Sequence, residues 1–329
     1  GNWEGKNVLE RVSTLEHVAN ALDLDLETAW RHLESARGKL FAHREKRVRP
    51  HLDDKILTAW NGLMIRAFAR GAVVLDEPRY AEAAARAADF VLTELRRDGR
   101  LLRRWREGEA GIEAFAEDYA FFVSGLIELY QCDLDPRWIE AAIELHDELF
   151  EVFGDRENGA LFNTRPGQDD LLVRTKAGYD GSVPTANSVA ASNALALFEL
   201  TGDGSKREQA ASIARVFAKV LTEAPLAMVS LVLAIDAMKN PGPTLVVSAA
   251  DRDEARDWIR TARAGYHPDL VVAHAPVDGG PDGLGVLEGR AATPDGPARG
   301  FVCRKFSCDA PTEDPTTLDS ALETTRTET

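Results

Sequence analysis

The sequence predicts a mainly α-helical fold in which helical hairpins build part of an α/α toroid, followed by a small α/β appendage. Three observations predict it: a motif repeated in apolar helical segments, prolines that mark the starts of second helices, and small residues gathered in the first helices. The motif is a polar residue, a small residue and leucine. Such internal repetition is typical of proteins built from stacked supersecondary units. The three copies are Asn61-Gly62-Leu63, Ser124-Gly125-Leu126 and Asn193-Ala194-Leu195.

Each motif is followed by a turn and a second predicted helix with a repeat of its own. The segment 78–84 parallels 136–142, and 209–211 is a weaker third copy. Proline suits a first helical turn and disrupts a helix interior, so Pro78 and Pro136 predict helix starts. The first two hairpins then end in a glycine, at positions 99 and 159, followed by a short extended segment.

Small residues are concentrated in the first helix of each pair, and they include Gly62 and Gly125. Glycine in a helix interior costs about 1 kcal/mol relative to alanine, so a repeated glycine predicts close approach of two helices. The second helices carry charge along one face, as Glu82, Arg86 and Glu94 illustrate. Crowded first helices and solvated second helices predict two concentric layers, as in a toroid. A linear solenoid is the alternative.

The remaining elements are predicted from periodicity and capping. Two further helices are expected at about 26–42 and 225–238. After Pro241-Gly242-Pro243 we expect a strand, a helix capped by Asp251 and a second strand, then a Gly/Pro-rich loop. The ranges of these last four elements are 244–249, 251–264, 270–274 and 278–300. The predicted domains are a partial α/α barrel at 1–240, an α/β element at 241–308 and an acidic disordered tail at 309–329.

The charge of the chain limits its partners. The formal net charge is −15, which predicts that neither nucleic acid nor an anionic membrane is a partner, since both favour Lys and Arg. No run approaches the roughly 18 apolar residues of a membrane span, and the N-terminus does not resemble a signal peptide. We therefore expect a cytoplasmic location. The first residue is Gly1 rather than methionine, which suggests a fragment.

The three cysteines and seven histidines predict no cofactor. Cys132 lies in a helical pattern and is expected in the core. Cys303 and Cys308 have C-x4-C spacing, which is neither the redox C-x-x-C nor half of a standard zinc site, so a structural or incidental role is expected. The histidines show no metal-ligand spacing, and no phosphate-binding loop or nucleophile elbow is present. Neither a metal nor another cofactor is predicted.

Candidate functional residues gather where the first helices are expected to begin. Asp54, Thr58 and Asn61 lie on one stripe of the first such helix. In a toroid the same ends of several inner helices meet around one pocket, so carboxylates from two repeats could act there as acid and base. The alternative for each aspartate is helix capping, which contributes about 0.5–2 kcal/mol without any catalysis. The candidate catalytic residues are Asp53, Asp54, Glu117 and Asp118. The candidate substrate-binding residues are His51, Trp60, Asn61, Tyr119, Tyr179, Asp180 and Asn187.

Several segments resemble one protein family. GNWEGKNVL at 1–9, KLFAHREKRVRPHLDDKILTAWNGLMIRAFA at 39–69, EDYAFFVSGLIELY at 117–130, YDGSVPTANSVAASNALAL at 179–197 and FVCRKFSC at 301–308 look like the thioredoxin-domain-containing, spermatogenesis-associated family, or domain of unknown function 255. The family's helical part is similar to the (α/α)6 barrel of six-hairpin glycosidases and sugar epimerases. A thioredoxin-like domain precedes that barrel in the family and is absent from this sequence.

This resemblance implies a function and a partner. It implies a carbohydrate-active, glycosidase- or epimerase-like pocket for a sugar-like small molecule, incomplete in this chain because the opening hairpins are missing. It also implies either a truncated product or a split protein, in which a separate chain or domain with the thioredoxin-like half completes the barrel. The alternative is a non-catalytic helical scaffold that binds a ligand or a thioredoxin-like partner domain.

Overall fold

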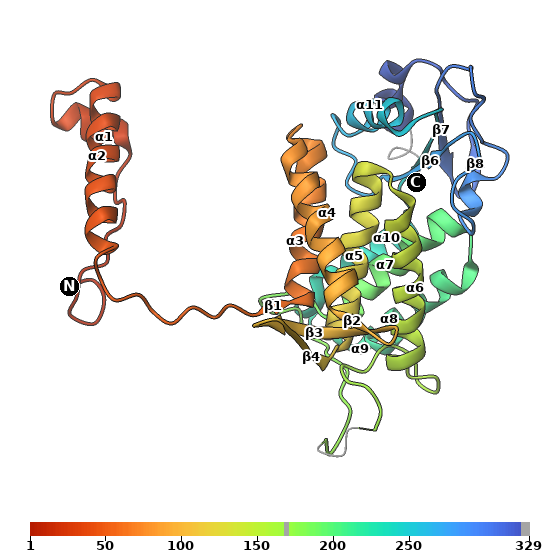
Figure 1. The fold of residues 1–329 in the computed structure, drawn as a ribbon, viewed down its shortest axis with the longest axis horizontal. Coiled ribbons are helices and arrows are strands. Elements are labelled where there is room, and N and C mark those ends of the chain that lie inside the picture. The colour runs from red at the N-terminus through yellow and green to blue at the C-terminus, as the bar shows by residue number, and fades with distance from the viewer. Residues whose placement is uncertain (168–170, 324–329) are drawn as a thin grey trace. The chain divides into compact units, whose positions relative to one another are not determined.

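The computed structural model describes residues 1–167 and 171–323, and the chain divides into two compact units, Gly1–Asp54 and Lys55–Thr329. The first unit holds helices α1 (Leu15–Ala21) and α2 (Leu26–Arg44), which pack on each other. The side chain of Thr14 caps α1 and that of Asp25 caps α2. The helix expected near 26–42 is therefore present. The positions of the two units relative to one another are not determined (Figure 1).

The second unit begins with strand β1 and contains the predicted hairpins and the appendage. The elements of the hairpin part are β1 (Ile56–Leu57), α3 (Thr58–Val74), α4 (Pro78–Glu94), β2 (Arg96–Arg97), β3 (Arg100–Arg106), β4 (Glu109–Glu113), α5 (Ala116–Asp133), α6 (Pro136–Phe153), α7 (Ala186–Thr201), α8 (Gly204–Val216), α9 (Ala218–Glu223), η1 (Pro225–Met228) and α10 (Val229–Lys239). The elements of the C-terminal part are β5 (Thr244–Ser248), α11 (Arg252–Ala262), β6 (Val271–Ala275), η2 (Gly285–Leu287), β7 (Arg299–Arg304), β8 (Ser307–Cys308), η3 (Pro315–Thr317) and α12 (Leu318–Glu323).

The helices form two layers, as the repeats predict. In the first layer α3 packs on α5, α5 on α7 and α7 on α10 (Figure 1). In the second layer α4, α6 and α8 each pack on the first helix of their own pair. Pro78 and Pro136 stand at the first positions of α4 and α6, where a missing amide hydrogen costs nothing. The prediction of a mainly α fold built from layered hairpins, with a small α/β appendage, is confirmed.

Two glycines allow α3 and α5 to approach closely. A Cβ atom added to Gly62 would lie 2.5 Å from the backbone carbon of Phe121 and the backbone nitrogen of Phe122. One added to Gly125 would lie 2.7 Å from the carbonyl oxygen of Gly62. Such distances are shorter than real carbon contacts, so alanine does not fit at either position without movement of the backbone. The close approach predicted from the repeated glycine is confirmed.

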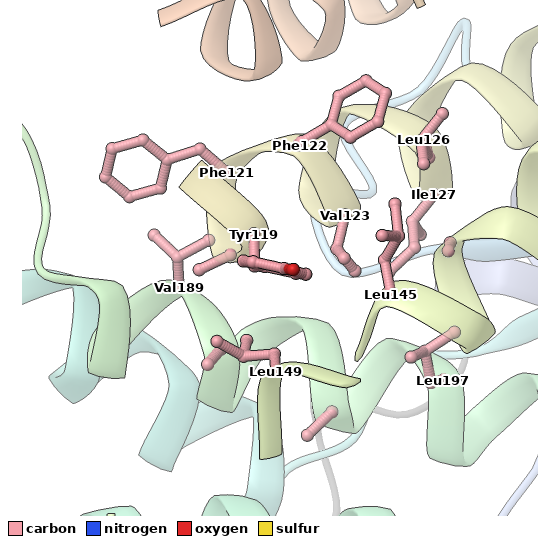
Figure 2. Close-up of a cluster of buried hydrophobic side chains, with 14 of the residues drawn as sticks. Tyr119, Phe121, Phe122, Val123, Leu126, Ile127, Leu145, Leu149, Val189 and Leu197 are labelled. Atoms are coloured by element: carbon pink, nitrogen blue, oxygen red, sulfur yellow. The ribbon is translucent and has the colours of Figure 1, made fainter. Parts of the chain in front are cut away.

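The core is centred on α5. All residues of this helix except Glu117 and Asp133 are buried. Its apolar side chains meet those of α6 and α7 in the cluster drawn in Figure 2, where Tyr119, Phe121 and Leu126 are labelled with partners such as Leu145 and Val189. A helix that is apolar on every side is stable in the interior of a protein. Its backbone groups are hydrogen-bonded within the helix, and burial of its apolar side chains lowers the free energy of the folded state.

A small sheet lies where α3 and α5 begin (Figure 1). Its central strand β3 pairs antiparallel with β1, β2 and β4, and Leu57 lies opposite Arg104. The extended segment predicted after Gly99 is thus a full strand. Within the described residues, the corresponding segment after Gly159 contributes one bridge, between Gly154 and Leu161.

The C-terminal sheet has the order β6-β5-β7-β8, with β5 and β6 parallel and the other pairs antiparallel. Asp251 caps α11 through the amide of Glu254, as predicted. The sheet is held to α5 by polar side chains: the amide of Val272 donates to Gln131 at 2.9 Å, and the amide of His274 donates to the Tyr130 hydroxyl at 3.3 Å.

Three features bear on the remaining sequence-based expectations. The division between the compact units falls between residues 54 and 55, within the predicted barrel, and the domain boundary predicted at 241 stays a prediction. The tail from 309, expected to be disordered, forms η3 and α12 up to residue 323, because Leu318 and Leu322 are buried against α11. Residues 324–329 lie outside the described part. Cys303 and Cys308 form a disulfide between paired strands, which agrees with the structural role expected for them.

Within the described residues, no helix has the length and apolar character that a membrane span requires.

Candidate functional site

Asp118 joins the N-terminal ends of α3 and α5. Its Oδ2 atom accepts a hydrogen bond from the amide of Phe115 at 2.8 Å, which closes the first turn of its own helix. Its Oδ1 atom accepts from the amide of Ala59 at 3.1 Å, in the first turn of α3. The residue before α3 is Leu57, whose side chain cannot cap. Asp118 therefore supplies from the second hairpin the cap that the first hairpin lacks.

Arg103 brings a second carboxylate to this point. Its Nη1 atom lies 2.9 Å from Glu117 Oε1 and 3.1 Å from Asp118 Oδ2, so the two predicted acids share one guanidinium nitrogen. The guanidinium also lies over the Phe115 ring, 4.6 Å from its centroid. Asp118 is fully buried, whereas the side chain of Glu117 keeps 38% of its exposure. Glu117 is thus the carboxylate of this pair that solvent reaches.

Burial raises the pKa of Asp118 to about 6. The loss of solvation is the largest cause, since a carboxylate without water favours its neutral form. The hydrogen bond from Phe115 and the charge of Arg103 act in the opposite direction, and the negative charge of Glu117 adds to the increase. A carboxyl group that titrates near pH 6 can exchange a proton close to neutrality.

Tyr119 is not placed to stack on a ligand in this structure. Its ring is fully buried, and burial raises the pKa of its hydroxyl to about 12. The hydroxyl donates to Glu148 at 2.5 Å and accepts from the amide of Leu101 at 3.2 Å and from Arg165 at 3.3 Å. The substrate-binding role predicted for Tyr119 does not fit this geometry, because every polar contact of its hydroxyl is internal.

Asp180, one hairpin later, caps the N-terminal ends of two helices, as Asp118 does. Its Oδ1 accepts from the amide of Thr185 at 2.8 Å and from the hydroxyl of Ser188 at 3.0 Å, at the start of α7. Its Oδ2 accepts from the amide of Ser230 at 2.8 Å, at the start of α10. The capping alternative considered for Asp118 and Asp180 is therefore what both side chains do.

Asn187 is also a structural side chain. It is fully buried, and its amide exchanges two hydrogen bonds with the backbone of Leu161, at 2.8 and 3.0 Å. A side-chain amide can replace a strand neighbour in this way, because it offers one donor and one acceptor in the same spacing. The predicted contact of Asn187 with substrate does not fit this burial.

Three of the predicted substrate-binding residues are exposed or partly exposed to solvent. Trp60 is 64% exposed and Tyr179 is 70% exposed. Asn61 is half-buried and donates to the carbonyl of Leu57 at 2.8 Å, directly before its own helix begins. Trp60 directly follows Ala59, the residue bound by Asp118, so its indole belongs to the same helix end as the carboxylate pair.

The remaining candidates belong to the first unit. His51, Asp53 and Asp54 are exposed and precede β1. The helix stripe predicted to start at Asp54 begins later, because Ile56 and Leu57 pair with β3 and α3 starts at Thr58. The roles predicted for these three residues remain predictions, since the units are not placed relative to each other.

Two surface cavities lie elsewhere on the second unit. One, of about 420 Å³, is lined by residues 155–159 and by Ser212, Arg215 and Val216. The other, of about 470 Å³, is lined by Thr201 and the glycine-rich segment 278–291. Neither cavity contains a predicted site residue. Among the described residues, no group of three or more His, Cys, Asp or Glu side chains is arranged to hold a metal ion.

Sequence reasoning missed Arg103, which organises the two acids. The signal was present only indirectly: Leu101-Leu102 and the arginines around them lie on one short strand after Gly99. Nothing in that local pattern shows which helix end the strand would cross, because the pairing of β3 with β1 joins residues far apart in sequence.

The fold and this helix end define a protein of layered helical hairpins with polar groups at the N-terminal ends of its inner helices. Comparison with curated proteins finds relatives along nearly the whole chain. Spermatogenesis-associated protein 20 from Homo sapiens is 32% identical over 98% of this chain and 43% of its own length. The Rattus norvegicus protein of that name is 30% identical, over 98% and 43% respectively. The Caenorhabditis elegans uncharacterized protein B0495.5 is 27% identical, over 94% and 44%.

The chain spans less than half the length of these relatives. No protein-family model matches it. Solved structures with a similar arrangement include a cellobiose 2-epimerase from Bacillus thermoamylovorans B4167, with a TM-score of 0.48 and 13% identity over 65% of this chain and 62% of that one. The GH76 alpha-mannanase BT2949 from Bacteroides thetaiotaomicron has a TM-score of 0.48 and 17% identity, over 65% and 58%.

Proposed function

We propose that this chain is the C-terminal part of a spermatogenesis-associated, thioredoxin-domain-containing protein, and that the N-terminal ends of α3 and α5 bind a sugar-like molecule. The observation that carries the proposal is the shared contact of Glu117 and Asp118 with one guanidinium nitrogen of Arg103. Sugar hydroxyls both donate and accept hydrogen bonds. A solvent-facing carboxylate beside a guanidinium offers a strong acceptor and a strong donor at adjacent positions.

Each residue of this group has a distinct part in the proposed binding. Glu117 accepts hydrogen bonds from the ligand, and Arg103, with 26% of its side chain exposed, donates to it. Asp118 is a positioning residue, because both its oxygens are already bound inside the protein. Trp60 offers an exposed aromatic face at the same helix end.

The proposal concerns ligand binding and not a chemical reaction. Hydrolase or epimerase chemistry needs an acid and a base that both reach the substrate. Glu117 supplies one such group at this helix end, so we propose ligand binding here and no reaction. The titration of Asp118 near pH 6 then influences Glu117 through Arg103 rather than through direct contact with substrate.

The test is saturable binding of neutral disaccharides, with cellobiose and mannobiose as probes, measured by isothermal titration calorimetry or by ligand-observed NMR. We expect Glu117→Gln to weaken binding at least about tenfold, the loss of one charge-assisted hydrogen bond. The matched control is Glu144→Gln, because Glu144 is also an exposed acid paired with an arginine, Arg96, and stands within α6 rather than at a helix start. Equal binding by the two variants, or no saturable binding by the parent chain, would overturn the proposal.

A second candidate function is a non-catalytic scaffold, and the end helices of the inner row favour it. On α3, Trp60, Met64 and Val74 are 64%, 52% and 58% exposed and follow helical spacing. At the other end of the row, Leu226 and Leu233 are 84% and 65% exposed. Exposed apolar stripes of this kind are typical of surfaces that receive another element.

Under this second candidate, a further helical segment or a thioredoxin-like domain packs on these end helices. The test is to co-express this chain with the remainder of the human relative and to measure a complex by size-exclusion chromatography with light scattering. Met64→Asp should abolish the complex while Glu82→Lys, on the charged outer face, leaves it intact. A complex that survives Met64→Asp would exclude α3 as the binding surface.

A further inference from the structure

We propose that Cys303 and Cys308 form a thiol–disulfide exchange site whose reacting partner is a dithiol. The two residues face each other across the antiparallel pair β7 and β8, and their sulfur atoms are bonded. Cys303 is buried, with 3% exposure, whereas Cys308 is half-buried and reaches solvent. An incoming thiolate therefore has access to one sulfur of the pair, that of Cys308.

The guanidinium of Arg290 contacts the accessible sulfur, that of Cys308. Its Nη2 atom lies 2.9 Å from Cys308 Sγ, while its Nη1 atom donates to the carbonyls of Val286 and Glu288, each at 2.9 Å. The backbone thus fixes the guanidinium with one nitrogen directed at the sulfur. A positive charge in that position attracts an incoming thiolate to the Cys308 sulfur, and it stabilises the Cys308 thiolate once that thiolate is released.

The exchange balances in two steps. A thiolate of the dithiol attacks Cys308 Sγ, the bond between the cysteines breaks, and Cys303 leaves as a thiolate that takes up a proton. The second thiolate of the dithiol then attacks its own sulfur in the mixed disulfide and releases Cys308 as a thiolate beside Arg290. The dithiol is oxidised to a disulfide and the cysteine pair is reduced by two electrons, and the reverse sequence reoxidises it.

The hairpin between the cysteines links this chemistry to the helical layer. Its two turn residues, Lys305 and Phe306, have φ angles of 51° and 64°, a conformation that is costly for residues other than glycine. The ring of Phe306 packs edge-on against Phe198 of α7, with ring centroids 4.9 Å apart. Reduction removes the link that holds this turn closed, so it should loosen the contact between the hairpin and α7.

The test uses the full chain carrying Cys132→Ser, which removes the other thiol. In this background we expect Cys303→Ser to form a mixed disulfide with oxidised lipoic acid or glutathione at least about tenfold faster than Cys308→Ser, because only Cys308 is accessible and paired with Arg290. Mass spectrometry follows the adduct, and circular dichroism confirms that both variants fold. Equal rates, or a faster rate for Cys308→Ser, would overturn the assignment.

Two further measurements test the proposal without the serine variants, in case one of these variants does not fold. Arg290→Gln, with the pair intact, should slow reduction by dithiothreitol by about tenfold relative to Arg299→Gln, an arginine on the same sheet without a sulfur contact among the described residues. Hydrogen exchange should rise at the C-terminal end of α7 on reduction. A disulfide reduced only when the chain unfolds, or at the same rate in both arginine variants, would show that the pair is purely structural.

Discussion

Asp118 and Asp180 do the same work in two neighbouring hairpins, with different surroundings. Each carboxylate joins the N-terminal ends of two inner helices, α3 with α5 in one case and α7 with α10 in the other. Asp180 is half-buried and its partners are amides and a hydroxyl. Asp118 is fully buried and shares Arg103 with Glu117. Both aspartates therefore cap helices, whereas, among the described residues, the pair of acidic side chains beside an arginine occurs at the start of α5 and not at Asp180.

The largest expected effect concerns the burial of these two aspartates. Asp118→Ala should lower the free energy of unfolding by about 3–5 kcal/mol, because it leaves the amides of Ala59 and Phe115 without their acceptor and removes one of the two carboxylates beside Arg103. Asp180→Ala should cost about 1–2 kcal/mol, the usual cost of losing a helix cap. Urea denaturation monitored by circular dichroism measures both. If Asp180→Ala were the more costly change, burial would not be the source of the difference.

The next expected effect concerns the helix pair that Asp118 joins. Gly62→Ala should lower the free energy of unfolding by about 1–3 kcal/mol, because its Cβ would meet the backbone of α5 at 2.5 Å. Gly71→Ala in the same helix is the matched control, since its Cβ would lie 3.7 Å from the Tyr80 ring, an ordinary contact. That change should stabilise the chain by up to about 1 kcal/mol. Thermal unfolding of the two variants would show opposite shifts, and shifts of the same sign would contradict the packing.

The smallest effect is the pH dependence that belongs to Asp118 alone. Its pKa is raised from 3.8 to about 6, so the folded chain holds this proton more tightly than the unfolded chain. The stability from this group is complete below about pH 4 and is lost as the pH rises through 6, by about 1 kcal/mol between pH 5 and 6. The amide introduced by Asp118→Asn does not titrate, so the difference between parent and variant isolates the contribution of this one carboxyl group.

That difference is best measured by urea denaturation at pH 4, 5, 6 and 7 for the parent chain and for Asp118→Asn. We expect the parent to lose stability relative to the variant across this range. A parent that gains stability relative to the variant as the pH rises would mean that Arg103 outweighs burial and that Asp118 stays charged.

The sequence predicted the hairpins well, because the relevant signals are local. The prolines that start α4 and α6 and the glycine pair between α3 and α5 each act through steric rules that hold wherever the chain lies. The tail was predicted less well. Leu318 and Leu322 are the two large apolar residues in a mostly polar segment. Their burial against α11 stabilises the short helix, and the local sequence does not show that α11 lies beside them.

The candidate site was predicted only in part, for a physical reason. The sequence indicated Glu117 and Asp118 together at a helix start, and the alternative of capping was visible in the same residues. It could not indicate Arg103, because the guanidinium lies beside both acids only when β3 and β4 have folded back on each other ahead of α5. It also could not indicate that Tyr119 and Asn187 face the interior, since polar groups satisfied by distant backbone look like site residues in a linear pattern.

The burial of α5 has a consequence for how the molecule opens. Nearly every residue of this helix is covered by neighbouring elements, so its amide hydrogens cannot meet solvent through local fraying of one layer. We expect its amides to exchange with deuterium only when the whole second unit unfolds, whereas those of α9 and α10 at the edge exchange through smaller openings. A proteolytic nick in an outer loop would then leave α5 as the last protected segment of the chain.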